Sequence, residues 1–293
     1  RFAQAFTAAG APAGLMTNIF LTHQQVEKVV IDQRIDFIAF TGSVAAGRQL
    51  QQVLAQRFVP IGLELGGKDP AYVAADADLS SAVAGLVDGA FYNSGQSCCG
   101  IERIYVHKSC YDDFIQQYVA LVKQYQLGDP LDKNTDLGPL VRRSAAQNVQ
   151  EQVIDAVAMG AENLVDPTQF NYHGEGAYLA PQVLADVNHQ MALMREESFG
   201  PVVGIMPVDN DAAALQLMND SDYGLTASIW TQSQDLALQM AKQLQTGTVF
   251  KNKCDYLDPA LVWTGVKNTG LGHSLSQLGY RQLSRAKSLN FHA

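Results

Sequence analysis

The sequence predicts an α/β fold built on a doubly wound, largely parallel sheet and divided into two units, the first of which has few strands. Three observations carry this prediction. Helical and extended apolar patterns alternate along most of the chain. The 293 residues, 47% of them hydrophobic, are enough for a large core and favour two domains over one. A break rich in glycine and proline, LGGKDP at 65–70, separates the two alternating stretches.

The first unit is expected to alternate three helices with three strands. The helices are predicted at 1–9, 23–31 and 43–57, and the strands at 16–21, 35–40 and 59–65. Phe2 and Phe6 share one face of the first helix, which we expect to end at Gly10. Ser43 is the expected N-cap of the third helix.

The second unit continues the alternation after the break. Its helices are predicted at 78–92, 109–125, 141–160, 211–219 and 233–244, and its strands at 101–107, 201–208, 226–231 and 247–251. Residues 128–139 read as a loop. The tail after Gly265 finishes in an extended SLNF segment at 288–291.

Charge and composition limit the partners. The formal net charge is −9 and the pI is about 5.0. No run of Lys or Arg forms a phosphate-tracking stripe, so nucleic acid and anionic membranes are poor partners. Neither a secretory leader nor an apolar run of membrane-spanning length is apparent, and we expect a cytoplasmic setting. The chain begins without Met inside a helix-like pattern, so we expect it to be part of a longer protein.

Two adjacent cysteines follow the helix predicted at 78–92, in the stretch FYNSGQSCCG at 91–100. Cys98 is preceded by small and polar residues, which favours an accessible and reactive thiol, whereas Cys110 and Cys254 are expected to be structural. Adjacent cysteines are poorly placed to form a disulfide or to share a zinc ion, and the six histidines are scattered, so no metal site is predicted. The preceding helix presents its negative end to Cys98, and the thiol therefore needs another source of activation.

Two further stretches each allow two interpretations. Glu64 ends an apolar strand just before two glycines. It is either an exposed strand-end residue or a carboxylate projected from the carboxyl edge of the sheet, where open α/β sheets bind ligands. Thr41, Gly42 and Ser43 stand between a strand and a helix. This turn either only caps the helix or binds an anionic phosphate, although it is neither GxGxxG nor a P-loop.

Taken together, the motifs resemble those of the aldehyde dehydrogenase superfamily over essentially the whole chain. The motifs occur in the family's order: FTGS at 40–43, ELGGK at 64–68, GQSC at 95–98, EESFGP at 196–201 and a degenerate WTGVKNTGLG at 263–272. The spacing of Glu64 and Cys98 is also similar to the family's. The resemblance implies the C-terminal part of an NAD(P)-binding domain at 1–66, a catalytic domain at 67–265 and a tail with an oligomerisation strand at 266–293.

The resemblance also implies roles. Cys98 would attack the aldehyde carbonyl to form a thiohemiacetal and then a thioester, its backbone N–H would help to stabilise the oxyanion, and Glu64 would activate water as general base. NAD or NADP would be the cofactor, and its nicotinamide cation would supply positive charge beside the thiol. The residues implied in cofactor binding are Thr41, Gly42, Ser43, Leu65, Gly66, Glu197 and Phe199. Those implied in the substrate pocket are Ser97, Cys99 and Trp263.

Several features depart from the family. Its members are longer, and the Asn that completes the oxyanion hole and the residues that grip the adenine ribose belong to a segment upstream of Arg1. The 293 residues alone are therefore expected to show little or no dehydrogenase activity, whereas a longer protein containing them should have ordinary activity. WTGVK replaces the usual PFGGxK, which changes substrate fit at Trp263. The preceding loop has no Arg, which disfavours acidic semialdehydes unless Lys251 or Lys253 substitutes.

The leading interpretation is thus an enzyme that oxidises a small-molecule aldehyde to a carboxylic acid, in a homodimer or homotetramer assembled through the SLNF segment. Two alternatives remain open. In the acylating branch of the superfamily, coenzyme A rather than water resolves the thioester. A truncated and inactive relative would instead act as an oligomer partner or binding module.

Overall fold

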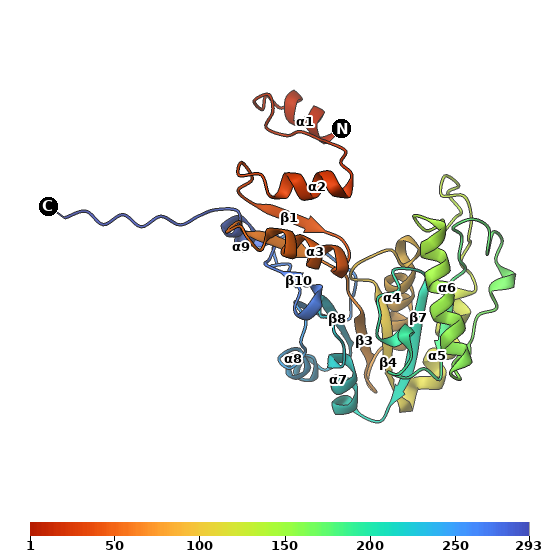
Figure 1. The fold of residues 1–293 in the computed structure, drawn as a ribbon. Helices are drawn as coiled ribbons and strands as arrows, with labels where there is room; N and C mark the ends of the chain where they lie inside the picture. Colours follow the sequence, from red (N-terminus) through yellow and green to blue (C-terminus); the bar gives the residue numbers. More distant parts are fainter. Residues whose placement is uncertain (293) are drawn as a thin grey trace.

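The structure, a computed structural model that describes residues 1–292, consists of two sheets with helices packed against them (Figure 1). A three-stranded sheet has the order β1-β2-β10, and a seven-stranded sheet has the order β5-β6-β7-β4-β3-β8-β9. Helices and parallel strands alternate along both units. The predicted α/β class, with a first unit that has few strands, is therefore confirmed.

The first sheet is small. Its helices are α1 (Phe2–Ala8), α2 (His23–Val30) and α3 (Val44–Leu54), and its strands are β1 (Ile38–Thr41), β2 (Ile61–Glu64) and β10 (Gly270–Leu271). β1 and β2 are parallel, and β10 returns from the far end of the chain to pair antiparallel with β2. Ser43 caps α3 as predicted, because its hydroxyl accepts a hydrogen bond from the Ala46 N–H at 3.3 Å.

The second sheet carries most of the core. Its strands are β3 (Asp69–Val73), β4 (Ile101–His107), β5 (Glu162–Asn163), β6 (Gln182–Ala185), β7 (Val202–Val208), β8 (Thr226–Trp230) and β9 (Thr248–Lys251). Neighbouring strands are parallel except for β5 and β6. The helices are α4 (Leu79–Phe91), α5 (Tyr111–Val122), α6 (Arg143–Ala158), α7 (Asp211–Asn219), α8 (Gln234–Ala241) and α9 (Ser276–Gln282), the last packed against the first sheet. Short 3₁₀ turns occur at Tyr92–Gly95, Lys108–Cys110, Pro167–Gln169, Ala192–Met194 and Lys267–Thr269.

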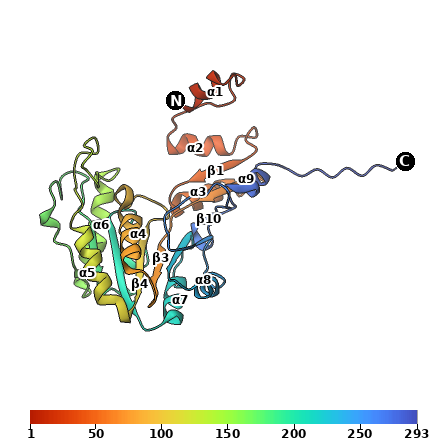
Figure 2. The same ribbon diagram turned by 180° about the vertical axis from the view of Figure 1, so that it is seen from behind.

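Helices cover both faces of the second sheet, as the two opposite views show (Figures 1 and 2). Leu86 and Phe91 of α4 and Phe114 of α5 are buried in a cluster on one face. Val149 of α6 and Met218 of α7 are buried on the other. Strand β3, in the interior of the sheet between β4 and β8, is consequently buried at every position, as expected for a parallel strand covered on both sides.

Some sequence predictions were wrong. Residues 16–21 form no strand, and Ile19 and Phe20 are 59% and 93% exposed. An apolar extended segment becomes a strand only when another strand takes up its backbone hydrogen bonds, and within residues 1–292 this segment has no such partner. Five elements were not predicted from the sequence: β3, β5, β6, β10 and α9. LGGKDP, predicted as a break, contains the start of β3.

The chain end lies apart from the rest of the molecule. Residues 285–292 have no regular structure and run away from the body in both views (Figures 1 and 2). Leu289 and Phe291 are 71% and 85% exposed. The division at 66 and 265 remains a prediction, and β10 of the predicted tail pairs with β2 of the first unit. Within residues 1–292, no helix has the length and apolarity needed to cross a membrane.

Candidate active site

Three of the motifs meet at the turn that follows β2. A Cβ atom added to Gly66 would lie 2.1 Å from Glu197 Oε2, and one added to Gly67 would lie 2.3 Å from the Cys98 carbonyl oxygen. Only glycine allows these approaches, which explains why the motif needs two. The ELGGK turn therefore lies directly between the cysteine loop and the EESFGP loop.

The FTGS motif lies on the neighbouring strand. Thr41 pairs in register with Glu64, and the Gly42 N–H donates to the Glu64 carbonyl oxygen at 3.1 Å. Thr41, Gly42 and Ser43 are exposed at the N-terminus of α3, where backbone N–H groups and the helix dipole favour an anion. Leu65 is buried, and its N–H donates to the Thr269 carbonyl oxygen at 2.8 Å.

Glu64 projects from the carboxyl end of β2 and is half-buried. Its Oε1 accepts a hydrogen bond from the Ser274 hydroxyl at 2.7 Å. Burial raises the pKa of the Glu64 carboxyl, while hydrogen bonds from Ser274 and Trp263 oppose that rise. Trp263 is itself buried, and its backbone exchanges two hydrogen bonds of 2.8 Å with Ser274. Within residues 1–292, no hydrogen bond joins this carboxyl to Cys98.

Cys98 lies in a loop after α4 and is partly buried, whereas Cys99 is buried. The Ser97 hydroxyl and the Cys99 thiol both donate to Asp255 Oδ1, at 2.9 and 2.8 Å. Contact with the Cys99 thiol lowers the pKa of Cys98, against burial and the negative charges of Asp255 and Glu197, which raise it. The same contact, together with burial and Asp255, raises the pKa of Cys99. Cys98 is therefore the thiol of the pair that ionises more readily.

Apolar side chains surround the two thiols. Cys99 is clustered with Leu225 and Trp263, and Cys98 and Leu275 pack against that cluster. Trp263, which the sequence placed in the pocket, thus lies in the same cluster as Cys99. Such a lining suits an uncharged carbon chain next to the two thiols.

Glu197 faces the ELGGK turn from a loop before β7, and Phe199 lies two residues further along the same loop. Glu197 Oε1 accepts a hydrogen bond from the Gly67 N–H at 3.1 Å, and burial raises the pKa of the carboxyl to about 7, assisted by the charge of Glu102. Phe199 is partly exposed with a left-handed φ of 50°. Its N–H donates to Glu102 Oε1 at 2.9 Å, which fixes this unusual backbone.

A buried ion pair that the sequence analysis missed supports this loop. Lys68 Nζ donates to Glu102 Oε2 and, at 3.0 Å, to the Ser198 hydroxyl. Glu102 Oε2 also accepts from the Ser198 N–H at 2.9 Å. Burial lowers the pKa of Lys68, and the charge of Glu102 opposes that change. Lys68 was visible within ELGGK, but no local signal indicated its partner 34 positions away.

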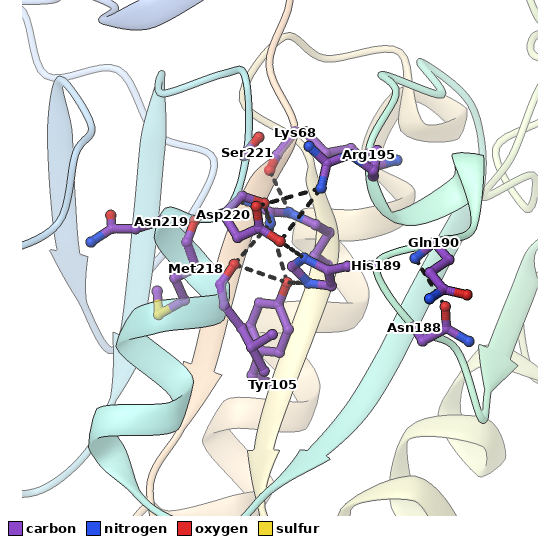
Figure 3. A network of polar contacts seen from close by, with 12 residues as sticks. Lys68, Tyr105, Asn188, His189, Gln190, Arg195, Met218, Asn219, Asp220 and Ser221 are labelled. Carbon is purple, nitrogen blue, oxygen red and sulfur yellow. Dashed lines mark hydrogen bonds and ion pairs between the residues drawn. The ribbon is translucent and has the colours of Figure 1, made fainter.

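A second network of hydrogen bonds contacts the backbone of the ELGGK turn at Lys68 (Figure 3). The buried Arg103 guanidinium donates to the Lys68 carbonyl oxygen at 2.9 Å and to the Tyr105 hydroxyl at 3.1 Å. That hydroxyl lies 2.7 Å from His189 Nε2, and His189 Nδ1 lies 2.6 Å from Asp220 Oδ2. Burial lowers the pKa of His189, so the neutral ring can accept from Tyr105 and donate to Asp220. This network ties β4 and the end of α7 to the turn.

The structure therefore brings together the ELGGK, GQSC, EESFGP and FTGS motifs. Asp255 and Ser274 are functional candidates that were not singled out from the sequence, although Asp255 lies in the loop before Trp263 and Ser274 follows the WTGVKNTGLG motif. Within residues 1–292, no group of three or more His, Cys, Asp or Glu side chains is arranged to hold a metal ion. The arrangement offers a thiol and a carboxyl, that of Glu197, against one turn, and a second carboxyl, that of Glu64, at the start of the same turn.

Known proteins are similar to this chain in sequence and in fold. An aldehyde dehydrogenase of Paenarthrobacter nicotinovorans is 37% identical over 284 residues, which are 97% of this chain and 62% of the relative. The succinate-semialdehyde dehydrogenase [NADP(+)] 1 of Mycobacterium tuberculosis is 33% identical over 287 residues, 98% of this chain and 62% of the relative. This chain thus spans 62% of the length of both curated relatives.

Solved structures agree. The NAD-dependent aldehyde dehydrogenase of Sinorhizobium meliloti matches with a TM-score of 0.92 and 32% identity, over 97% of this chain and 57% of that one. The NADP-dependent glyceraldehyde-3-phosphate dehydrogenase of Bacillus halodurans, complexed with NADP, matches with a TM-score of 0.89 and 35% identity, over 96% and 58%. Residues 1–289 match the sequence pattern described as the aldehyde dehydrogenase family. The chain belongs to the aldehyde dehydrogenase family.

Proposed function

We propose that this chain carries the catalytic centre of an NAD(P)-dependent enzyme that oxidises an aldehyde to a carboxylic acid. One observation carries the proposal: the turn after Glu64 contacts both the backbone of Cys98 and the carboxylate of Glu197. A nucleophile, a base and a cofactor-binding acid therefore share one turn. The family membership supports the same reaction.

The residues present fit a nicotinamide dinucleotide. Glu197 Oε2 accepts no hydrogen bond within residues 1–292 and is free for ribose hydroxyls, while Oε1 is held by Gly67. The exposed turn of Thr41, Gly42 and Ser43 would receive the pyrophosphate. Phe199, Leu65 and Gly66 complete the proposed binding surface. When bound, NAD(P)⁺ supplies the hydride acceptor.

The remaining chemistry falls to the chain's own side chains. The Cys98 thiolate bonds to the aldehyde carbon while the carbonyl electron pair moves to oxygen, which the Cys98 backbone N–H stabilises. After the carbon has been oxidised to the thioester level, Glu64 takes a proton from a water molecule as the water oxygen bonds to the acyl carbon. The carbon–sulfur bond then breaks and the Cys98 thiolate leaves. The absence of a direct hydrogen bond from Glu64 to Cys98 suits a base that acts through water.

We also propose a homodimer or homotetramer joined through residues 288–291, because their apolar side chains are exposed on an extended segment. The four cysteines are free in the structure, which favours the reducing cytoplasm as the setting.

The test uses protein expressed from the whole gene. NADH and NADPH formation is measured with aliphatic, aromatic and acidic aldehydes. We expect turnover that falls by at least about a thousandfold in Cys98→Ala and stays unchanged in Cys110→Ala, whose thiol donates to the His107 carbonyl oxygen away from the site. Glu64→Gln should give about one equivalent of reduced cofactor in a burst and then slow turnover, because hydrolysis lacks its base.

Two results would replace the proposal. Folded protein without turnover on any aldehyde would indicate the inactive relative. Turnover that requires coenzyme A would indicate the acylating branch.

A further inference from the structure

The loop between β9 and Trp263 places a negative charge next to the proposed nucleophile. Asp255, in a left-handed conformation with φ of 44°, directs Oδ1 to the Ser97 hydroxyl at 2.9 Å and to the Cys99 thiol at 2.8 Å. These two residues flank Cys98 in sequence. The carboxylate is therefore fixed beside Cys98 by two hydrogen bonds rather than free to swing into solvent.

The cations of the same loop are directed elsewhere. Lys253 Nζ lies 3.1 Å from the centre of the Tyr256 ring, and Lys251 Nζ donates to the Gln232 carbonyl oxygen at 3.4 Å. Neither contacts Ser97, Cys98 or Cys99 within the part of the chain that the structure describes. Neither lysine is therefore placed beside the thiols, where an Arg could pair with a substrate carboxylate.

The other side chains whose charge acts on Cys98, Glu197 and Asp69, are also acids. Glu197 approaches through the ELGGK turn, while Lys68, the cation nearest to that turn, is paired with Glu102 and buried. The side chains clustered with the two thiols are apolar. A substrate carboxylate entering here would meet like charge, and among residues 1–292 it would find no cation placed beside the thiols.

We propose that Asp255 determines specificity by rejecting aldehydes that carry a carboxylate, so that the substrate of this site is a neutral or cationic aldehyde. The inference rests on the proposed function for turnover, but the charge effect at Cys98 is measurable without it. The proposed preference for uncharged or cationic aldehydes distinguishes this chain from the relatives named for succinate semialdehyde.

The first test follows alkylation of Cys98 by neutral iodoacetamide and anionic iodoacetate, using peptide mass spectrometry and protein from the whole gene. The rate ratio of iodoacetate to iodoacetamide is normalised to that of 2-mercaptoethanol. We expect a depressed ratio in the wild type that rises roughly tenfold in Asp255→Asn. Asp258→Asn is the matched control, because this carboxylate of the same loop bonds only to the Ala260 N–H at 2.9 Å and should leave the ratio unchanged.

A wild-type ratio equal to that of the small thiol, or no rise in folded Asp255→Asn, would overturn the proposal. If Asp255→Asn does not fold, the alkylation rate ratio of the wild type is measured at low and at high salt. Salt screens the negative charge, so a ratio that is depressed by Asp255 should rise at high salt. An unchanged ratio would again count against Asp255.

The second test compares kcat/KM for butanal and for succinic semialdehyde. The wild type should prefer butanal, and Asp255→Asn should shift the preference roughly tenfold toward the acid, with no shift in Asp258→Asn. Loss of turnover on both aldehydes with charge-selective alkylation intact would remove the dehydrogenase function and leave the Asp255 effect standing. Turnover with the same preference in the wild type and in Asp255→Asn would support the dehydrogenase function and remove the proposed role of Asp255.

Discussion

The position of Glu197 in the site disfavours its ionised carboxylate. Its carboxyl is mostly buried and has one protein hydrogen bond, from Gly67, and burial raises its pKa to about 7. In the unfolded chain the carboxyl ionises near its ordinary value of 4.5, so between these two pH values the folded state retains a proton that the unfolded state has lost. The contribution of this group to stability therefore falls as the pH rises from about 4.5 to about 7.

Glu197→Gln should remove that dependence. The free energy of unfolding of the variant is compared with that of the wild type at pH 5 and at pH 8. The difference should shift in favour of the variant by up to about 3 kcal/mol between the two pH values. The variant should also bind NAD(P) more weakly. Urea unfolding at both pH values measures the gain, with the exposed neighbour Glu196→Gln as control. An equal difference between variant and wild type at the two pH values would contradict the pKa assignment.

Candidate site residues within short motifs could be chosen from the sequence, but the distant residues that contact them could not. Cys98 and Glu64 were singled out because each lies in a short pattern with a local rationale, whereas Glu197 was implied only by the family resemblance. Asp255 and Ser274 reach Cys99 and Glu64 across 156 and 210 positions of sequence. Such contacts depend on how the elements pack, which no local pattern encodes.

At the scale of elements, the Lys68–Glu102 ion pair joins the start of β3 to β4 and holds the loop at 198–199. Glu102→Gln keeps an oxygen for the two backbone N–H groups but leaves a buried ammonium without an anion. We expect a loss of about 3–5 kcal/mol in the free energy of unfolding.

Combining Lys68→Met with Glu102→Gln should recover a large part of that loss, because the buried charge is then gone. Urea unfolding of the two single variants and the double variant measures the coupling. Glu151→Gln, on the exposed side of α6, is the control. A double variant less stable than Glu102→Gln would show that the ion pair is not what stabilises this junction.

Most helices and strands were predictable because their apolar periodicity matches the face that they bury, as at 101–107, which is β4. β3 was missed because Asp69 and Pro70 are typical of turns. A register shift between these two residues accommodates the proline in a central strand. The opposite error at 16–21 arose because apolar content indicates a strand without supplying the neighbour that it must pair with.

At the scale of the whole molecule, residues 285–292 present apolar side chains to solvent on an extended segment. If this segment pairs with another copy, removing residues 285–293 from the full protein should lower the mass measured by light scattering. Lys287→Ala, a surface change within the segment, should leave the mass unchanged. An unaltered mass after truncation would show that assembly uses another surface.

The loop that carries Asp255 is anchored at both ends and exposed between them. The Asn252 side chain exchanges hydrogen bonds of 2.9 and 3.1 Å with the backbone of Thr231, and Trp263 is paired with Ser274. Tyr256 and Leu257, between these anchors, are exposed and carry little of the core. Substitutions in this short stretch can therefore change the proposed choice of aldehyde during evolution, while the strands and turns that hold the proposed catalytic residues stay the same.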